Sequence, residues 1–293
     1  MTKPPARCRS WLFAPGDSAR KTEKAIASDA DMVILDLEDA VALEAKPGAR
    51  RMVADALGAA GEGRARIWVR INPLSGGMAE DDLAAVMPAR PGGIMLPKAE
   101  SGADMIALNT LIMPLESAHG IAPGSTPVHP LVTETAAAMF GTGSYRDTPR
   151  LAAMSWGAED LADSIGSLAN TGADGRYRPT YELARSLCLL GAAAASVPAI
   201  ETIMGDFRDL DGLKARAEMV RRDGFRGMLA IHPDQVPVIN AASTPGEDEI
   251  AEAREIVRIF ADNPGAGTIA WPRGMLDRPH LSRAQQILAQ LDE

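Results

Sequence analysis

Short apolar runs recur along the chain, and each is followed by a polar or glycine-containing break and then by a segment with a helical pattern. Most of these runs are continuous rather than alternating, which is typical of strands buried on both faces of a parallel sheet. The eight runs lie at residues 10–14, 32–37, 67–71, 93–96, 128–132, 151–155, 196–200 and 227–231. Helical patterns occupy residues 18–28, 44–57, 181–194, 210–222 and 245–260, among others.

Eight β-then-α units in one chain predict an α/β protein built as a (β/α)₈ TIM barrel. A doubly wound open sheet is the competing architecture. The segment after residue 262 differs in kind, because a break at Asn263-Pro264-Gly265 leads into an irregular stretch, residues 271–279, and a last helix at residues 280–291. We therefore expect a catalytic barrel over residues 1–262 and a C-terminal helical extension over residues 263–293.

The composition is that of an ordinary soluble globular protein, with 293 residues of which 46% are apolar and 24% charged. The net charge of −9 argues against non-specific nucleic-acid binding, which requires clustered Lys and Arg. No apolar run reaches the roughly 18 residues of a membrane span, and residues 1–7 lead into the first run without the features of a signal peptide. Cys8 and Cys188 are isolated, which suggests a reducing compartment, and we expect a cytoplasmic protein.

Charged or ionisable residues follow seven of the eight apolar runs, where a barrel gathers its βα loops around one mouth. Glu134 follows the fifth run and Asp160 the sixth, so their carboxylates could meet near Asp36, Glu38 and Asp39, which follow the second. Oxygen ligands without Cys or paired His suit a hard ion such as Mg²⁺ or Mn²⁺. The alternative is that these acids cap the helices that begin after the strands. The set as a whole favours a divalent-metal site.

Cations stand at the same rim. Arg70 follows the third run and could hold a carboxylate or stabilise an oxyanion, while Lys98 follows the fourth as a point charge; both could instead form structural ion pairs with the acids. Arg20 and Lys24, in the first helical segment, could meet phosphate, or could belong to a solvated helix face. His232, after the eighth run, is more often a hydrogen-bonded structural residue than a base. No Gly-x-Ser-x-Gly, HExxH or Walker motif supports a hydrolase, zinc-protease or NTPase.

A set of motifs, in order along nearly the whole chain, resembles the citrate lyase β-subunit-like family of the HpcH/HpaI aldolase superfamily, which includes malyl-CoA and citramalyl-CoA lyases. The motifs are Arg9-Ser10-Trp11-Leu12-Phe13-Ala14-Pro15-Gly16, Leu35-Asp36-Leu37-Glu38-Asp39-Ala40-Val41, Val69-Arg70-Ile71-Asn72, Leu96-Pro97-Lys98, Thr133-Glu134-Thr135, Trp156-Gly157-Ala158-Glu159-Asp160, Ile231-His232-Pro233-Asp234-Gln235 and Leu276-Asp277-Arg278-Pro279-His280.

The resemblance implies a barrel that binds Mg²⁺ and a CoA thioester and makes or breaks a carbon–carbon bond. It implies Glu134 and Asp160 as metal ligands and Arg70 as the group that holds the keto acid and the thioester oxygen. Asp277 matches an acid that reaches into a neighbouring subunit's site, and family members are usually trimers or hexamers. Residues that match substrate or CoA contacts are Phe13, Ala14, Lys24, Ile231 and His232.

These observations together predict a Mg²⁺-dependent lyase that cleaves malyl-CoA, methylmalyl-CoA or citramalyl-CoA to an acyl-CoA and a 2-oxo acid. We expect Arg70, Asp277 and Glu38 to be catalytic, and Arg20, Lys98 and Glu134 to contribute to substrate binding. Three alternatives remain: a malyl-CoA thioesterase, a metal-dependent 2-oxo acid aldolase that does not use CoA, and a citrate lyase β subunit that works in a larger complex. We expect no nucleic-acid or membrane partner and a homotrimer or hexamer.

Overall fold

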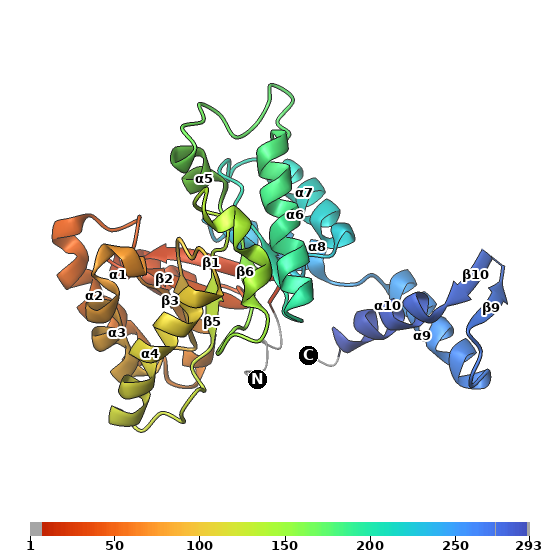
Figure 1. Cartoon of the computed structure of the whole chain (residues 1–293), viewed down its shortest axis with the longest axis horizontal. Coiled ribbons are helices and arrows are strands. Elements are labelled where there is room, and N and C mark those ends of the chain that lie inside the picture. The colour runs from red at the N-terminus through yellow and green to blue at the C-terminus, as the bar shows by residue number, and fades with distance from the viewer. Residues whose placement is uncertain (1–7, 273, 292–293) are drawn as a thin grey trace. The chain divides into compact units, whose positions relative to one another are not determined.

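The computed structural model describes residues 8–272 and 274–291. Strands and helices alternate along most of the chain (Figure 1). The strands are β1 (Ser10–Pro15), β2 (Met32–Asp36), β3 (Ile67–Arg70), β4 (Gly93–Leu96), β5 (Val128–Pro130), β6 (Met154–Ser155), β7 (Ala199–Glu201), β8 (Gly227–Ala230), β9 (Thr268–Trp271) and β10 (Gly274–Asp277). The α-helices are α1 (Ala19–Ile26), α2 (Lys46–Ala59), α3 (Ala79–Val86), α4 (Gly102–Ala118), α5 (Ala158–Ser164), α6 (Pro179–Ala194), α7 (Leu210–Asp223), α8 (Gln235–Ser243), α9 (Glu247–Asp262) and α10 (Arg278–Ala289). Among these helices, none combines the length and the apolar character needed to cross a bilayer.

The first eight strands form one parallel sheet in the order β5-β4-β3-β2-β1-β8-β7-β6. Its two end strands also meet, because the backbone N–H of Val132 donates to the carbonyl of Ser155 at 2.9 Å and parallel bridges join Val128 to Leu151 and Leu131 to Ser155. The sheet thus closes on itself, with α1 to α4 along one side of the strands and α6 to α8 along the other (Figure 1). The predicted (β/α)₈ barrel with a C-terminal extension is confirmed.

Side chains along the strands alternate between the barrel interior and the surrounding helices, as the two-residue period of a strand requires. The interior cluster consists of Trp11, Met32, Ile34, Trp68, Met95, Leu131, Ala152, Ala153, Ile200 and Leu229. One inward position further along β1, β2 and β3 stand Phe13, Asp36 and Arg70. Apart from His129 and Ser155, the described interior is apolar up to its C-terminal end, where charged side chains replace apolar ones.

One histidine lies within this interior. His129 on β5 is fully buried, its Nε2 lies 2.7 Å from the Ser155 hydroxyl, and its ring packs edge-on against Trp11 at 4.6 Å. Burial lowers the pKa of His129 to about 3. The imidazole is therefore neutral at ordinary pH.

The crossover between β5 and β6 departs from the regular pattern. In this described stretch the chain forms only short 3₁₀ helices, Ala138–Phe140 and Thr142–Tyr145, and the two helices α5 and α6 both follow β6. Residues 141–145 contain Gly141 and Gly143, which disfavour a longer α-helix.

The chain divides into two compact units, residues 1–240 and 241–293. The second unit contains α9, an antiparallel hairpin of β9 and β10, and α10, and its apolar cluster includes Ile256, Phe260 and Leu276. This division falls earlier than the boundary drawn from the sequence after residue 262, because the apolar face of α9 packs with α10 and the hairpin. The stretch expected to be irregular, residues 271–279, contributes β10 to that hairpin.

Candidate active site

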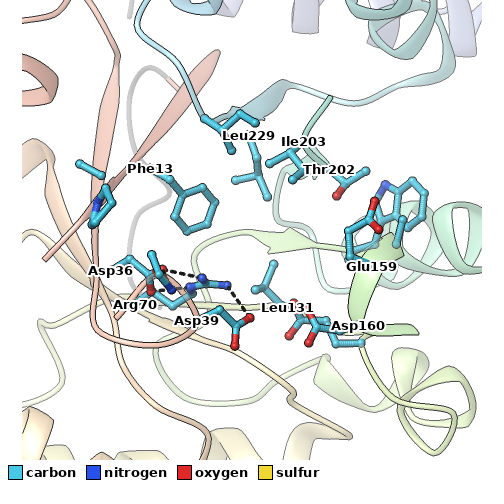
Figure 2. A pocket seen from close by; sticks show the side chains of 18 residues that line it. Phe13, Asp36, Asp39, Arg70, Leu131, Glu159, Asp160, Thr202, Ile203 and Leu229 are labelled. Carbon is cyan, nitrogen blue, oxygen red and sulfur yellow. Dashed lines mark hydrogen bonds and ion pairs between the residues drawn. The ribbon is translucent and has the colours of Figure 1, made fainter. Parts of the chain in front are cut away.

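A cavity of about 450 Å³ opens at the C-terminal ends of the barrel strands, where the sequence places its candidate residues (Figure 2). Charged side chains border one part of it and apolar side chains another, with Leu229 and Ile203 across the cavity from Arg70 and Asp160 (Figure 2). The bordering residues are Phe13, Ala14, Pro15, Asp36, Asp39, Ala40, Arg70, Leu131, Glu134, Trp156, Gly157, Ala158, Glu159, Asp160, Thr202, Ile203, Leu229 and Ile231.

Arg70 is held in one position by the strand beside it. Parallel pairing places Asp36 of β2 opposite Arg70 of β3, and the guanidinium donates from Nε to Asp36 Oδ1 at 2.7 Å and from Nη2 to Oδ2 at 2.6 Å. Its plane also lies over the Phe13 ring, 4.9 Å from the centroid. Burial would raise the pKa of Asp36, but Arg70 and the backbone N–H groups of Glu38 and Ala40 hold it below its usual range. This bidentate pair fixes a permanent cation at the cavity.

Lys98 forms ion pairs with two acids of the site, Glu38 and Asp160. Its ammonium contacts Glu38 Oε1 and lies 2.9 Å from Asp160 Oδ1. Glu38 Oε2 also lies 2.9 Å from Arg70 Nη1, so one buried carboxylate forms ion pairs with both cations. Burial opposes the charge on Lys98, but hydrogen bonds with Glu38 and Asp160 raise its pKa above the usual value. From the sequence, Arg70 and Lys98 could have formed structural ion pairs instead of serving the site. They do form ion pairs, and these pairs lie at the cavity, since Asp36, Arg70 and Asp160 border it.

Glu134 is the most deeply placed acid of the predicted metal pair. Its side chain is 4% exposed and its Oε2 accepts the backbone N–H of Lys98 at 2.6 Å. A left-handed backbone at Lys98, φ 51°, turns that N–H toward it. Gly157 makes the close approach possible, because a Cβ there would lie 2.7 Å from Glu134 Cγ. Burial and the nearby charge of Asp160 raise the pKa of Glu134 to about 8.

The site carries more carboxylates than cations. Arg70 and Lys98 face five acids, which are Asp36, Glu38, Asp39, Glu134 and Asp160. Among the described residues no three potential ligands converge as a ready-made metal cage. Glu134 and Asp160 fit Mg²⁺ nonetheless, because this ion often takes one or two carboxylates and leaves its other positions to water and substrate oxygens.

Five of the remaining predicted residues fall into two groups. Phe13, Ala14 and Ile231 border the cavity, whereas Arg20 and Lys24 are exposed on α1 and are not among the described residues that border it. Their contribution to CoA binding stays a prediction.

His232 stacks on Phe207 with ring centroids 4.8 Å apart, and its Nδ1 accepts the backbone N–H of Asp234 at 3.2 Å. These contacts suit the structural role considered for a lone histidine. The Phe207 ring itself gave no signal in the sequence, since it lies in a loop outside every periodic segment.

Asp277 lies in the second unit, where it caps α10. Its Oδ1 lies 2.5 Å from His280 Nδ1, and that hydrogen bond holds the pKa of Asp277 below its ordinary value. Asp277 is therefore ionised at neutral pH, as a proton acceptor would be. Its place in a neighbouring subunit's site stays a prediction.

Two further residues, Trp156 and Glu201, were given no catalytic or binding role from the sequence. Trp156 borders the cavity directly before Gly157, and its indole N–H donates to Glu201 Oε1 at 2.7 Å. Glu201 was recognised only as one of the acids at strand ends. The available signal was a large aromatic residue immediately after an apolar run.

A parallel barrel with a carboxylate-rich mouth and a fixed arginine is the arrangement of a metal-assisted aldolase or lyase. Similarity to known proteins indicates the same class of enzyme. The model of the HpcH/HpaI aldolase/citrate lyase family matches residues 9–233. The chain belongs to this family of enzymes, whose members include lyases that act on CoA esters.

Individual relatives cover nearly the full length of the chain. It is 33% identical to a (3S)-malyl-CoA thioesterase of Cereibacter sphaeroides over 97% of this chain and 94% of the relative. It is also 33% identical to an L-malyl-CoA/beta-methylmalyl-CoA lyase of Cereibacter sphaeroides over 99% of this chain and 96% of that protein. The crystal structure of CitE from Mycobacterium tuberculosis in complex with magnesium, acetoacetate and coenzyme A superposes with a TM-score of 0.80, at 34% identity, covering 99% of this chain and 100% of that one.

Proposed function

We propose that this protein is a Mg²⁺-dependent lyase that cleaves a β-hydroxyacyl-CoA, such as malyl-CoA, methylmalyl-CoA or citramalyl-CoA, into an acyl-CoA and a 2-oxo acid. The observation that carries the proposal is the surplus of carboxylates at the cavity beside a fixed arginine. Glu134, buried next to Asp160, has no cationic side chain of its own within the site, since Lys98 pairs with Glu38 and Asp160. A divalent cation would balance these charges.

Relatives of the chain support the same reading. The CitE structure contains magnesium and coenzyme A, and the lyase relative acts on malyl-CoA and methylmalyl-CoA by its name. Glu134 and Asp160 would hold the Mg²⁺, which, when bound, polarises the substrate's hydroxyl and carbonyl oxygens.

Cleavage passes the hydroxyl proton to a base or to water, breaks the carbon–carbon bond and leaves the electron pair of that bond on the thioester as an enolate, which then takes a proton on carbon. Arg70 provides the positive charge for the enolate oxygen, and the Asp36 pair holds the guanidinium in place so that it need not reorganise during the reaction. Asp277 of a neighbouring subunit would exchange the proton with that carbon: its carboxylate would accept the proton of an acyl-CoA in the condensation direction, and its protonated form would return one to the enolate in the cleavage direction.

The test is an assay of the chain alone with malyl-CoA, methylmalyl-CoA, citramalyl-CoA and citryl-CoA, with and without Mg²⁺. Two products are followed in parallel: the 2-oxo acid, and the free CoA thiol. A lyase releases the 2-oxo acid without free thiol, and this release stops when Mg²⁺ is chelated or when Glu134→Gln is introduced. Glu116→Gln, a buried carboxylate outside the cavity, serves as the matched control and keeps the activity of its folded fraction.

The other outcomes identify the alternatives. Thiol and hydroxy acid released together without 2-oxo acid indicate a thioesterase, the activity named for one relative at 33% identity. Turnover of a free hydroxy-oxo acid with no need for CoA indicates an aldolase. Activity only after addition of an acyl-carrier subunit indicates a citrate lyase β subunit, and any of these three results overturns the proposal.

A further inference from the structure

Lys46 is buried at the first residue of α2, where the partial positive charge of the helix N-terminus opposes a cation. Its Nζ donates to the backbone carbonyl of Leu37 at 2.8 Å and to that of Glu38 at 2.9 Å. No carboxylate is among these described partners, although a buried charge is usually balanced by an opposite one. The two carbonyls of residues 37–38 therefore determine where this ammonium lies.

These carbonyls belong to the turn after β2 that carries acids of the site. The N–H of Glu38 donates to Asp36 Oδ1 at 2.9 Å while its carbonyl accepts Lys46, so the backbone of Glu38 is held on both sides. The Glu38 carboxylate, which is buried, contacts the Lys98 ammonium and lies 2.9 Å from Arg70 Nη1. A displacement of the backbone at residue 38 would therefore move the acid that pairs with both cations of the site.

Each of the two carbonyls also accepts a second donor. Asn72 Nδ2 donates to the Leu37 carbonyl at 3.0 Å, and the backbone N–H of Val41 donates to the Glu38 carbonyl at 3.1 Å. Neither carbonyl would be left without a donor if Lys46 were replaced by Met, so no buried acceptor would lose all its bonds. The turn should therefore stay folded in Lys46→Met and lose its attachment to α2.

We propose that Lys46 is a positioning residue, which holds residues 37–38 against the start of α2 and thereby keeps the Glu38 carboxylate in place between Arg70 and Lys98. Lys46 is not among the described residues that border the cavity, so it acts through Glu38 rather than on the substrate. The expected effect on the reaction rate rests on the proposed function, whereas the expected effect on the Arg70 side chain does not depend on which reaction the site performs.

The first measurement follows Arg70 itself. In protein labelled with ¹⁵N-arginine, the Nε–H of a fixed guanidinium gives a signal in a ¹H–¹⁵N spectrum, and the Arg70 signal is identified by its loss in Arg70→Lys. Lys46→Met should shift or broaden this signal by more than its own line width, because the guanidinium loses a fixed partner at Nη1. The signal of Arg150, whose Nε donates to Asn109 Oδ1 at 2.7 Å away from the cavity, should stay unchanged.

The second measurement compares turnover by the wild type, Lys46→Met, Glu38→Gln and the double variant, corrected for the folded fraction and made with the CoA ester that the wild type cleaves fastest. Lys46→Met should lower kcat by about 10–100-fold with a smaller change in KM, as the displacement of groups around a reacting centre commonly does. The double variant should be no slower than Glu38→Gln alone, because Lys46 acts through that carboxylate. Arg150→Met, which removes a buried cation away from the cavity, is the matched control and should keep the kcat of its folded fraction.

An unchanged Arg70 signal in folded Lys46→Met overturns the inference, and so do losses in kcat that simply add in the double variant. A shifted signal together with a wild type that cleaves none of the CoA esters supports the positioning role and contradicts the proposed lyase activity. Cleavage by the wild type with an unchanged signal has the opposite meaning. If Lys46→Met does not fold, Lys46→Gln, whose amide keeps a neutral donor, should show the same changes at a smaller size, and their absence there overturns the inference.

Discussion

Replacing Asp36 by Asn should lower both the stability of the protein and its activity. Asp36 is 2% exposed and accepts four hydrogen bonds, two from the Arg70 guanidinium at 2.7 and 2.6 Å and two from the backbone N–H groups of Glu38 at 2.9 Å and Ala40 at 3.2 Å. Asn cannot accept both guanidinium bonds, since its NH₂ group is itself a donor. Arg70 then loses its fixed position and turns toward Glu38, which already lies 2.9 Å from Nη1.

The size of both effects follows from this geometry. Removing one partner of a buried ion pair costs about 3–5 kcal/mol of folding free energy. Displacing a preorganised group that stabilises an oxyanion lowers turnover by roughly 10²–10³-fold. We therefore expect Asp36→Asn to show both losses.

Glu116→Gln is a matched control for Asp36→Asn. Glu116 is also buried, accepts Arg150 Nη1 and Nη2 at 2.6 and 2.7 Å, and receives two backbone N–H groups, from Gly124 at 2.7 Å and Thr126 at 3.0 Å. It does not border the described cavity. Glu116→Gln should therefore lose comparable stability while its folded fraction keeps normal kcat/KM.

The assay combines urea unfolding with malyl-CoA turnover, both corrected for the folded fraction. Burial would raise the pKa of Glu116, but Arg150 and the backbone amides lower it to about 2, so its ion pair stabilises the fold above the usual value of 4.5 and loses that effect as the pH falls toward 2. The stability difference between wild type and Glu116→Gln should shrink over that range. Normal kcat/KM in folded Asp36→Asn would refute the reasoning about Arg70.

Three further predictions concern the metal, the second unit and assembly. Because burial raises the pKa of Glu134 to about 8, Mg²⁺ binding should release a proton below that pH and should weaken by up to tenfold per pH unit as the pH falls. Calorimetry in buffers of different ionisation heat measures this proton release, and Mg²⁺ binding that does not change between pH 6 and 8 contradicts it. Asp277→Asn should abolish turnover while Mg²⁺ binding and thermal unfolding stay normal, and near-normal turnover would contradict its proposed role. If Asp277 serves a neighbouring subunit, mixing inactive Asp277→Asn with inactive Arg70→Lys should restore part of the activity, and light scattering should give a trimer or hexamer.

Much of the barrel could be predicted because a strand buried on both faces has a local signature. The second and fourth apolar runs match β2 and β4 to within a residue, and all their residues are buried. The convergence of Arg70, Lys98 and Glu134 could also be predicted, since parallel strands present their C-terminal ends to one rim.

The partners within the site could not be predicted, because they depend on register and long-range packing. Asp36 faces Arg70 only because β2 and β3 pair in one particular register. The bond between Trp156 and Glu201 joins the residue after β6 to the last residue of β7, and no sequence pattern links them. The hairpin of the second unit escaped detection because its strands, four residues each, are too short for a clear periodicity.

The neutral histidine in the barrel interior simplifies how a pH–rate profile of this protein is to be understood. Of the four histidines in the sequence, His129 stays uncharged until the pH approaches 3, and it is the one enclosed in the barrel beneath the site. An inflection of the rate between pH 6 and 7 therefore cannot come from the charging of the barrel's core. It must come from groups outside the barrel interior.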